Sequence, residues 1–315
     1  MFKKFFILFI FLLFTFFLFA DEKQDEGLKL LLSKFKKNND EFSYNDETIN
    51  KLQKLVEKND LENFFIELMN LTKSKGEKEE DIQKAYLDLI YLLAINKKYN
   101  ESIFFIDEVK SIFKNIPDDF EEWISFIEIY AKANQKTKQY KILEAIEQFT
   151  DKYKDSIWYE AILLIKISEY KKIGYLTGIE KTSYELYEIN KEAVLNNQEL
   201  YNNTKKHLEK TGNYNKLVNL VKYYIKKFSN KKDLENEYYF LAQYYDSIDN
   251  KNLAKKYYQI IAENKDSVFA ADAIYWLANY YLTKDKRKAK SYFSDLMKYE
   301  AYKELAEKKL NEISR

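Results

Sequence analysis

The chain has 315 residues, of which 33% are charged and 17% aromatic, with only five glycines and one proline. So little Gly and Pro argues against β-sandwiches and barrels, and the absence of Cys excludes disulfide scaffolds, thiolate metal sites and cysteine nucleophiles. Because 52 basic side chains are balanced by 51 acidic ones, the chain has no global basic surface, and we expect no nucleic-acid partner.

Residues 1–20 have the three parts of a secretory signal peptide. Two lysines precede an apolar run at 5–19, and Ala20 stands directly before Asp21. An uncleaved membrane anchor is the alternative, although the run is short for a span of about 20 residues. We therefore expect an exported, periplasmic protein, tethered to the membrane if this segment is retained, and no further transmembrane span.

Two weaker elements come next along the chain. Residues 21–47 are predicted to be a polar linker with a short amphipathic helix, whose apolar face is Leu28, Leu31, Leu32 and Phe35. We interpret this helix as a cap or as an element that joins two copies of the chain, with a membrane-surface helix as the alternative. Residues 48–73 are predicted to form a degenerate helical hairpin, with apolar contacts among Leu52, Leu55, Leu61, Phe64, Phe65 and Leu68.

A repeat runs through the remainder of the chain. The segment 239–245 (YFLAQYY) recurs as 275–281 (YWLANYY), and 254–258 (AKKYY) recurs as 289–293 (AKSYF), displaced by 36 and 35 residues. Short polar breaks separate segments of about 12–18 residues, a length that favours helices over strands. Helices joined by short breaks become antiparallel neighbours, so this period predicts a solenoid of stacked two-helix units.

Each repeat begins an apolar stripe at helical spacing. The repeats start at six anchors, separated by 37, 35, 43, 37 and 36 residues: Tyr86, Trp123, Trp158, Tyr201, Tyr238 and Ile274. In the fifth repeat the stripe follows the i, i+3, i+4, i+7 pattern of one helix face: Tyr238, Leu241, Ala242 and Tyr245. The gap of 43 residues predicts an insertion near 174–178 or near 196–197, and residues 302–313 are predicted to be a capping helix.

These repeats resemble the tetratricopeptide repeat family, in which an aromatic anchor is followed by a Leu-small pair and by Tyr, and the second helix carries Ala and an aromatic residue. The matching residues are Tyr238, Leu241, Ala242, Tyr245, Ala254 and Tyr258, and then Ile274, Leu277, Ala278, Tyr281, Ala289 and Phe293. The match is good over 235–298, fair over 83–155 and weak from 160 to 215. The resemblance implies an all-α, right-handed helical-hairpin solenoid of about six to seven hairpins over residues 48–315.

The segment 270–281 (AADAIYWLANYY) is also similar to the C-terminal repeats of the periplasmic Tol–Pal coordinators and of the repeat lipoproteins that assemble outer-membrane barrels. This resemblance implies an exported, non-enzymatic scaffold that binds a protein partner in the cell envelope. Our alternative is a glycan-binding accessory protein of the cell wall, or a helical module that supports a wall enzyme, because Tyr and Trp rings stack on sugars.

We find no candidate catalytic, cofactor-binding or metal-binding residue in the sequence. The single histidine, His207, has no elbow motif or second metal ligand nearby, and we interpret it as a solvated surface residue. Neither a P-loop nor a G-x-G-x-x-G sequence is present. Acidic clusters at 79–81, 118–122 and 235–237 fall at predicted helix starts, where we interpret Asp118 with Glu121 as a capping box.

The resemblance also implies which residues line a partner-binding groove. In the family, the residues one, five and eight positions after the anchor face the concave surface, which here are Tyr239, Gln243, Asp246, Tyr275, Asn279 and Leu282. Tyrosine rings supply contact area, and amides hydrogen-bond an extended peptide, so these residue types suit the task. An ordinary surface position remains the alternative for each of them.

Overall fold

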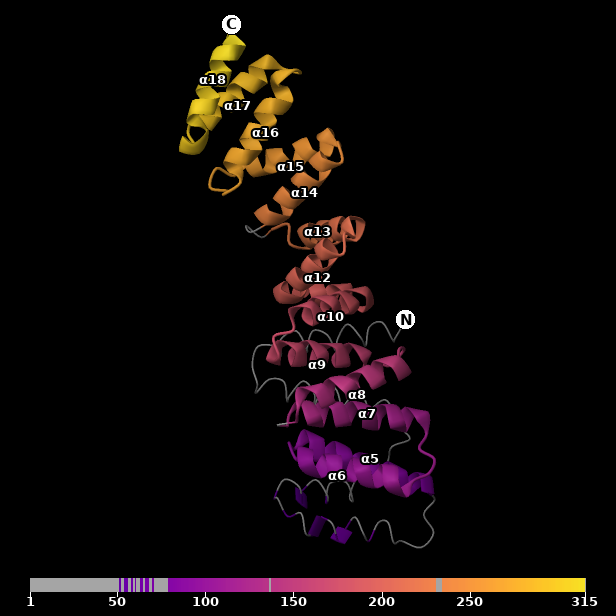
Figure 1. The fold of residues 1–315 in the computed structure, drawn as a ribbon. Coiled ribbons are helices and arrows are strands. Elements are labelled where there is room, and N and C mark those ends of the chain that lie inside the picture. The colour runs from indigo at the N-terminus through magenta and orange to yellow at the C-terminus, as the bar shows by residue number, and fades with distance from the viewer. Residues whose placement is uncertain are drawn as a thin grey trace. The chain divides into compact units, whose positions relative to one another are not determined.

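The computed structural model describes residues 79–135, 137–230 and 234–314, with scattered positions between 51 and 70. Within these ranges the chain forms helices and no strand, so the all-α prediction is confirmed (Figure 1). The predicted signal segment 1–20 and the predicted linker helix in 21–47 lie outside the described residues. Contacts divide the chain into an N-terminal unit, residues 1–207, and a C-terminal unit, residues 208–315.

The N-terminal unit is a succession of helical hairpins. Its helices are α5 (Glu79–Ile95), α6 (Tyr99–Ile112), α7 (Asp118–Ala133), α8 (Gln139–Lys152), α9 (Tyr159–Lys172), α10 (Leu176–Ile189), the short α11 (Lys191–Asn196) and the first part of α12 (Gln198–Lys210). Consecutive helices from α5 to α11 pack together, and α7 also packs on both α5 and α9. The helices that carry the predicted stripes therefore contact one another directly, as the repeat predicts.

Bulky side chains fill the core of the N-terminal unit. All four residues of the first predicted stripe are buried: Tyr86, Leu89, Ile90 and Leu93. Between successive hairpins the rings of Phe126 and Trp158 stack at 4.4 Å with an interplanar angle of 14°. Phe64 is fully buried, and Leu55 packs partly buried against the same core. The other contacts predicted for that hairpin, Leu52, Leu61, Phe65 and Leu68, lie outside the described residues.

The insertion predicted from the 43-residue gap is the short helix α11. The buried Asn190 caps α11 by accepting a hydrogen bond from the backbone N–H of Ala193 at 3.2 Å. Asn197 then accepts from the backbone N–H groups of Glu199 and Leu200, at 3.0 and 3.1 Å, where α12 begins. The other predicted location is a tight turn, in which Gly174 has a φ of +70° that favours glycine.

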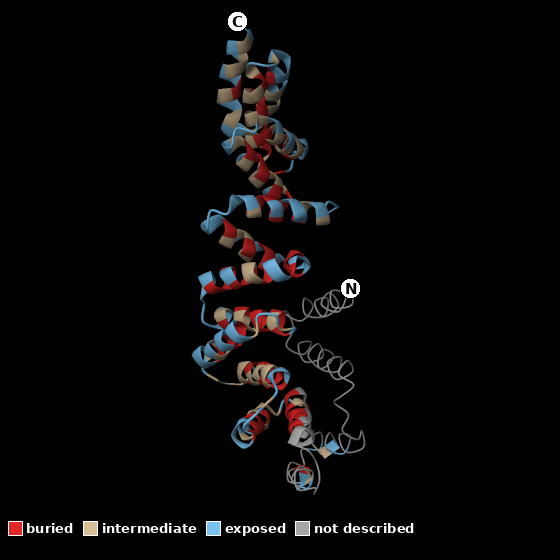
Figure 2. Cartoon of the chain, turned by 90° about the vertical axis from the view of Figure 1, so that its right-hand side faces the viewer, coloured by how far each residue is buried: buried red, intermediate tan, exposed pale blue. Residues whose placement is uncertain are grey.

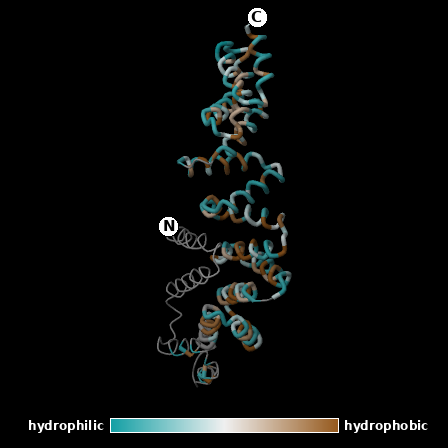
Figure 3. Tube along the Cα trace, turned by 90° about the vertical axis from the view of Figure 1, so that its left-hand side faces the viewer, coloured by the Kyte–Doolittle hydropathy of each residue, from teal (hydrophilic) through white to brown (hydrophobic). Residues whose placement is uncertain are grey.

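The C-terminal unit contains the repeats whose residues most resemble the tetratricopeptide pattern. After the end of α12 come α13 (Tyr214–Lys227), α14 (Glu235–Ser247), α15 (Lys251–Glu263), α16 (Ala270–Leu282), α17 (Lys286–Leu296), the 3-10 turn η1 (Glu300–Tyr302) and α18 (Lys303–Ser314). Each α-helix from α13 to α18 packs on the next one (Figure 1). The helices turn buried residues toward their neighbours and exposed residues outward, and polar and apolar residues accordingly alternate along them (Figures 2 and 3).

The sequence repeat is also a repeat of side-chain geometry. The rings of Tyr245 and Tyr257 stack at 5.8 Å with an interplanar angle of 9°, and those of Tyr281 and Tyr292 stack with the same values. Leucine and alanine in the stripes are fully buried: Leu241, Ala242, Leu277 and Ala278. The anchor Tyr238 is only half buried, and it stacks on Tyr257 at 6.3 Å. The predicted register therefore holds, although this anchor lies at the edge of the core.

The last helix closes the apolar core of the C-terminal unit. Ala306 of α18 is fully buried, and Tyr302, Leu310 and Ile313 pack against the same core as Phe293. This arrangement matches the capping helix predicted over 302–313. No helix in the described part of the chain combines the length and apolar character that a bilayer span requires.

Two local predictions are wrong. The capping box of Asp118 and Glu121 does not form, because Pro117 occupies the N-cap position of α7 and has no side-chain acceptor. Glu121 instead forms an ion pair with Lys152 at 2.6 Å. His207 is less exposed than predicted, because it is partly buried and its ring stacks on that of Tyr184 at 5.0 Å.

The other acidic clusters fit their predicted positions in part. Glu235 and Glu237 lie in the first turn of α14, where a carboxylate complements the helix dipole. Glu235 also accepts a hydrogen bond from the side-chain amide of Asn264. The cluster at 79–81 begins α5, but its side chains lie outside the described ones.

Candidate binding pocket

A pocket of about 630 Å³ opens on the C-terminal unit. Its lining comes from α14, α15, α16, the loop after α16 and η1: Tyr239, Lys251, Tyr258, Asp272, Tyr275, Trp276, Asn279, Tyr280, Thr283, Lys284 and Tyr302. One face of α16 supplies about half of these residues, because positions three and four apart lie side by side on a helix. The pocket therefore lies where the first helix of the last hairpin meets the preceding hairpin and the capping turn.

Three of the six residues predicted to line a groove line this pocket: Tyr239, Tyr275 and Asn279. Leu282 packs partly buried against the core of the unit. Gln243 is exposed and hydrogen-bonds Tyr239, while Asp246 pairs with a lysine of the lining. These three residues, Leu282, Gln243 and Asp246, therefore border or support the pocket and do not form its wall.

A carboxylate with two tyrosine donors marks one end of α16 in the pocket. Asp272 accepts a hydrogen bond from the hydroxyl of Tyr239 at 3.0 Å and a short one from the hydroxyl of Tyr302. The bond to this carboxylate, together with burial, raises the pKa of Tyr302 to about 12. Burial first and the carboxylate second raise the pKa of Tyr239 as well. Both phenols therefore remain protonated donors at neutral pH.

Stacked rings hold the middle of the pocket in place. Trp276 stacks on Tyr258 at 4.6 Å and on Tyr280 at 5.3 Å. The ring of Tyr239 stacks on Phe269 at 4.2 Å. Because each ring rests on another ring, the aromatic wall is preorganised and loses little side-chain entropy when a ligand binds.

Lysines surround the opposite end of α16. The ammonium group of Lys284 lies 3.8 Å from the ring centre of Tyr280, and that of Lys255 lies 5.7 Å from it. The hydrogen bond with Lys284 lowers the pKa of Tyr280, because a cation favours the phenolate. This end of the pocket is therefore electropositive.

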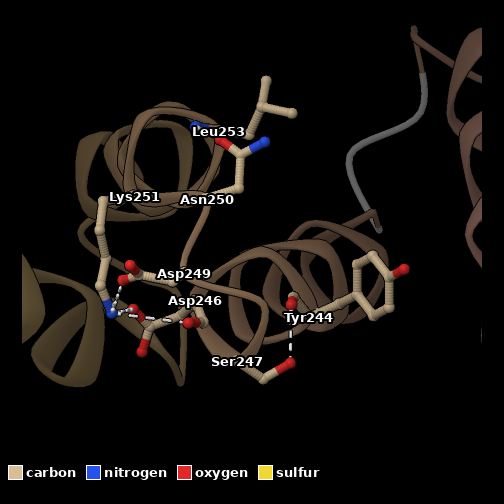
Figure 4. A network of polar contacts seen from close by, with 7 residues as sticks. All are labelled: Tyr244, Asp246, Ser247, Asp249, Asn250, Lys251 and Leu253. Atoms are coloured by element: carbon tan, nitrogen blue, oxygen red, sulfur yellow. Dashed lines mark hydrogen bonds and ion pairs between the residues drawn. The ribbon is translucent and has the colours of Figure 1, made fainter.

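The remaining lysine of the lining is held in a local network (Figure 4). Lys251 forms ion pairs with Asp246 at 2.7 Å and with Asp249 at 3.6 Å, at the turn between α14 and α15. In the same turn Asn250 caps α15 by accepting from the backbone N–H of Leu253 at 3.3 Å. The pairing neutralises Lys251 and explains why Asp246 faces this turn.

The sequence reasoning missed the residues that give the pocket its charge and most of its rings. Asp272, Trp276 and Tyr280 were not selected, although they lie on the same face of α16 as Tyr275 and Asn279. The signal that could have identified them is the spacing of three and four residues that begins at Asp272. Among the residues that the structure describes, no group of three or more His, Cys, Asp or Glu is arranged to hold a metal ion.

Comparisons with known proteins find similar chains among solved structures. No protein-family model matches the sequence, and no curated protein matches it. The chain is similar to a crystal structure of a tetratricopeptide repeat protein from Parabacteroides merdae, with 14% identity and a TM-score of 0.38 over 86% of this chain and 98% of that one. It is also similar to the apo form of RapI, with 12% identity and a TM-score of 0.35 over 80% of this chain and 75% of RapI. The fold class itself rests on the helices and their contacts.

Proposed function

We propose that this chain is a non-enzymatic scaffold that binds an extended segment of a partner protein in the pocket along α16. The observation that carries the proposal is the preorganised aromatic wall of Trp276 and Tyr280, backed by the buried Tyr258, with polar groups at both ends. Rigid aromatic side chains supply binding energy at protein interfaces, and polar groups at the rim orient the ligand.

The proposal includes export to the cell envelope. Its support is the sequence of residues 1–20 and the similarity of 270–281 to the repeats of periplasmic Tol–Pal coordinators and outer-membrane assembly lipoproteins. N-terminal sequencing of the chain isolated from fractionated cells tests this part. A chain that starts at Asp21 in the periplasmic fraction, or at Met1 in the membrane fraction, supports export. A full-length chain in the cytosol contradicts it.

Site-specific photocrosslinking in living cells tests the binding function. The probe replaces Thr283, which lines the pocket and is exposed, and the matched control probe replaces Ser291, an exposed hydroxyl residue of α17 outside the lining. We expect a discrete protein to be captured from position 283 and not from position 291. Purification of that protein then allows its affinity to be measured directly.

Other outcomes of this experiment separate the alternatives. Equal capture from both positions, or capture from neither, contradicts a protein-binding pocket. Binding of purified wall polymer in the absence of any captured protein would favour a glycan-binding accessory protein. Capture of a second copy of this chain would assign the pocket to self-association.

A further inference from the structure

The charged residues that line the pocket differ in whether they have a partner of opposite charge. Of the three charged residues in the lining, Lys251 is neutralised by Asp246 and Asp249. Asp272 has two neutral phenols as hydrogen-bond donors and no cationic partner among the described residues. Lys284 lies on a ring face and has no carboxylate within ion-pair distance among the described residues. One negative and one positive charge are therefore left for a ligand.

The negative end suits a basic side chain. Asp272 is half buried, so its charge is less screened than that of an exposed carboxylate. The half-buried ring of Tyr275 follows it on the same face of α16 and lines the pocket, where it can accept a cation–π contact. An arginine or lysine side chain of a ligand can therefore meet a carboxylate and an aromatic ring together.

The positive end suits an acidic side chain, at a distance that the helix defines. Lys284 and Lys255 both lie beside Tyr280, which is eight residues after Asp272 on α16. At about 1.5 Å per helical residue, the two ends are about 12 Å apart. An extended chain advances about 3.3 Å per residue, so about four residues of a bound segment span this distance.

We infer that the pocket selects an extended protein segment with a basic side chain at the Asp272 end and an acidic side chain about four residues away at the Lys284 end. The inference rests on the proposed function, because it specifies the segment that the scaffold binds. The two uncompensated charges fix the direction of the segment, and the rings between them accept its intervening side chains.

Position-fixed peptide libraries test this inference on the full-length chain. Each fluorescein-labelled nonamer library carries Arg at position 2 and Glu at one position from 3 to 9, or the two residues in the reverse order, with the other positions randomised. An uncharged library carries Gln at both fixed positions. We expect the strongest binding at a separation of about four residues, and at least a tenfold weaker signal from the uncharged library. Raising the salt concentration reduces the difference between the two libraries.

Matched variants test which end of the pocket binds the basic side chain and which end binds the acidic one. Asp272→Asn keeps the size of the side chain and is expected to abolish the preference for Arg, whereas Asp266→Asn, at an exposed position outside the lining, leaves it unchanged. Lys284→Gln is expected to weaken the preference for Glu, with Lys265→Gln as the exposed control. Circular dichroism confirms that each variant remains folded.

Three results would overturn the inference. They are equal binding of charged and uncharged libraries, binding that does not depend on the separation between Arg and Glu, and no binding by any library. The capture experiment at Thr283 distinguishes these results from a failure of the proposed function. A protein captured there leaves the scaffold function standing without the charge rule, whereas a failed capture removes both.

Discussion

The first helix of each repeat has a residue four positions after the anchor. This residue differs between the repeats of the two units. In the first three repeats these residues are isoleucines, and in the last two they are alanines, all fully buried: Ile90, Ile127, Ile162, Ala242 and Ala278. A single methyl group lets neighbouring helices approach closely and leaves less interior volume to fill. We therefore expect a larger core volume at these positions in the N-terminal unit, called the thick core below, than at α14 and α16, called the thin core.

The two units also differ in the burial of particular aromatic side chains. In the N-terminal unit Phe126 and Trp158 stack inside the core, at 1% and 3% exposure. In the C-terminal unit Trp276, Tyr275 and Tyr239 are only half buried and line the pocket. Aromatic side chains therefore serve packing in both units, and in the C-terminal unit some of them also line the pocket.

The largest expected effect on stability comes from shortening a buried side chain in the thick core. Ile127→Ala removes a fully buried side chain and is expected to lower the free energy of unfolding by about 2–5 kcal/mol, because the remaining cavity is only partly closed. Hydrogen-exchange mass spectrometry of peptides from α7 measures the local loss of protection. Unchanged protection in α7 would show that the isoleucine position is not a core position.

The N-terminal unit is also expected to respond to pH. Burial raises the pKa of Glu160 to about 7, and its hydrogen-bond partner is the side-chain amide of Asn190 at 3.0 Å. Because the folded-state pKa lies above the usual value of 4.5, the folded chain binds this proton more tightly than the unfolded chain does. The resulting stabilisation, on the order of 3 kcal/mol, is fully present below pH 4.5 and is lost as the pH rises through 7.

Denaturation curves between pH 4 and pH 8 measure this dependence. Glu160→Gln keeps the hydrogen bond to Asn190 without a titrating group, so the variant is expected to lose the decline in stability between about pH 4.5 and pH 7. The same decline in the variant and in the unmodified chain would contradict the assignment to Glu160.

A smaller effect is expected from overfilling the thin core. Ala278→Ile introduces the residue that the first three repeats carry at the same position, into a site with 0% exposure. We expect a loss of about 1–3 kcal/mol, because the neighbouring helices must move apart. Urea denaturation measures the loss. A variant as stable as the unmodified chain would show that α16 is not closely packed and would break the comparison.

The smallest expected effect lies in the pocket. Tyr302→Phe removes one hydroxyl donor to Asp272, which is expected to cost about 1 kcal/mol locally. Hydrogen exchange in η1 and α18 measures this change, with Tyr299→Phe as a control at a half-buried tyrosine outside the lining. Equal effects of the two substitutions would indicate a general loss of packing, not a specific bond to the carboxylate.

Helical periodicity was enough to predict most of the hairpin architecture. The stripe at Leu241 and Ala242, the repeat of Tyr245 at Tyr281 and the capping helix all follow from local spacing, and the structure has each of them. The place of the insertion stayed open between two breaks, because 174–178 and 196–197 both contain turn-forming residues.

The pocket was predictable only in part, because its decisive contacts are not local. Tyr302 bonds to Asp272 across 30 residues of sequence, through the whole of the last hairpin. The pairing of Lys251 with Asp246 depends on the turn between α14 and α15, where Asp249 adopts a positive φ of 57°. The predicted groove residues came from a family pattern that specifies helix positions, and it contains no information about these partners.

The affinity of the captured partner for two matched variants tests the central claim most directly. Thr283→Arg places a long side chain at the pocket, and Ser291→Arg places the same side chain on α17 outside the lining. Both positions are exposed, so neither change is expected to disturb the fold. We predict that Thr283→Arg weakens binding at least tenfold while Ser291→Arg leaves it unchanged. Equal affinity of the two variants would contradict a partner-binding pocket along α16.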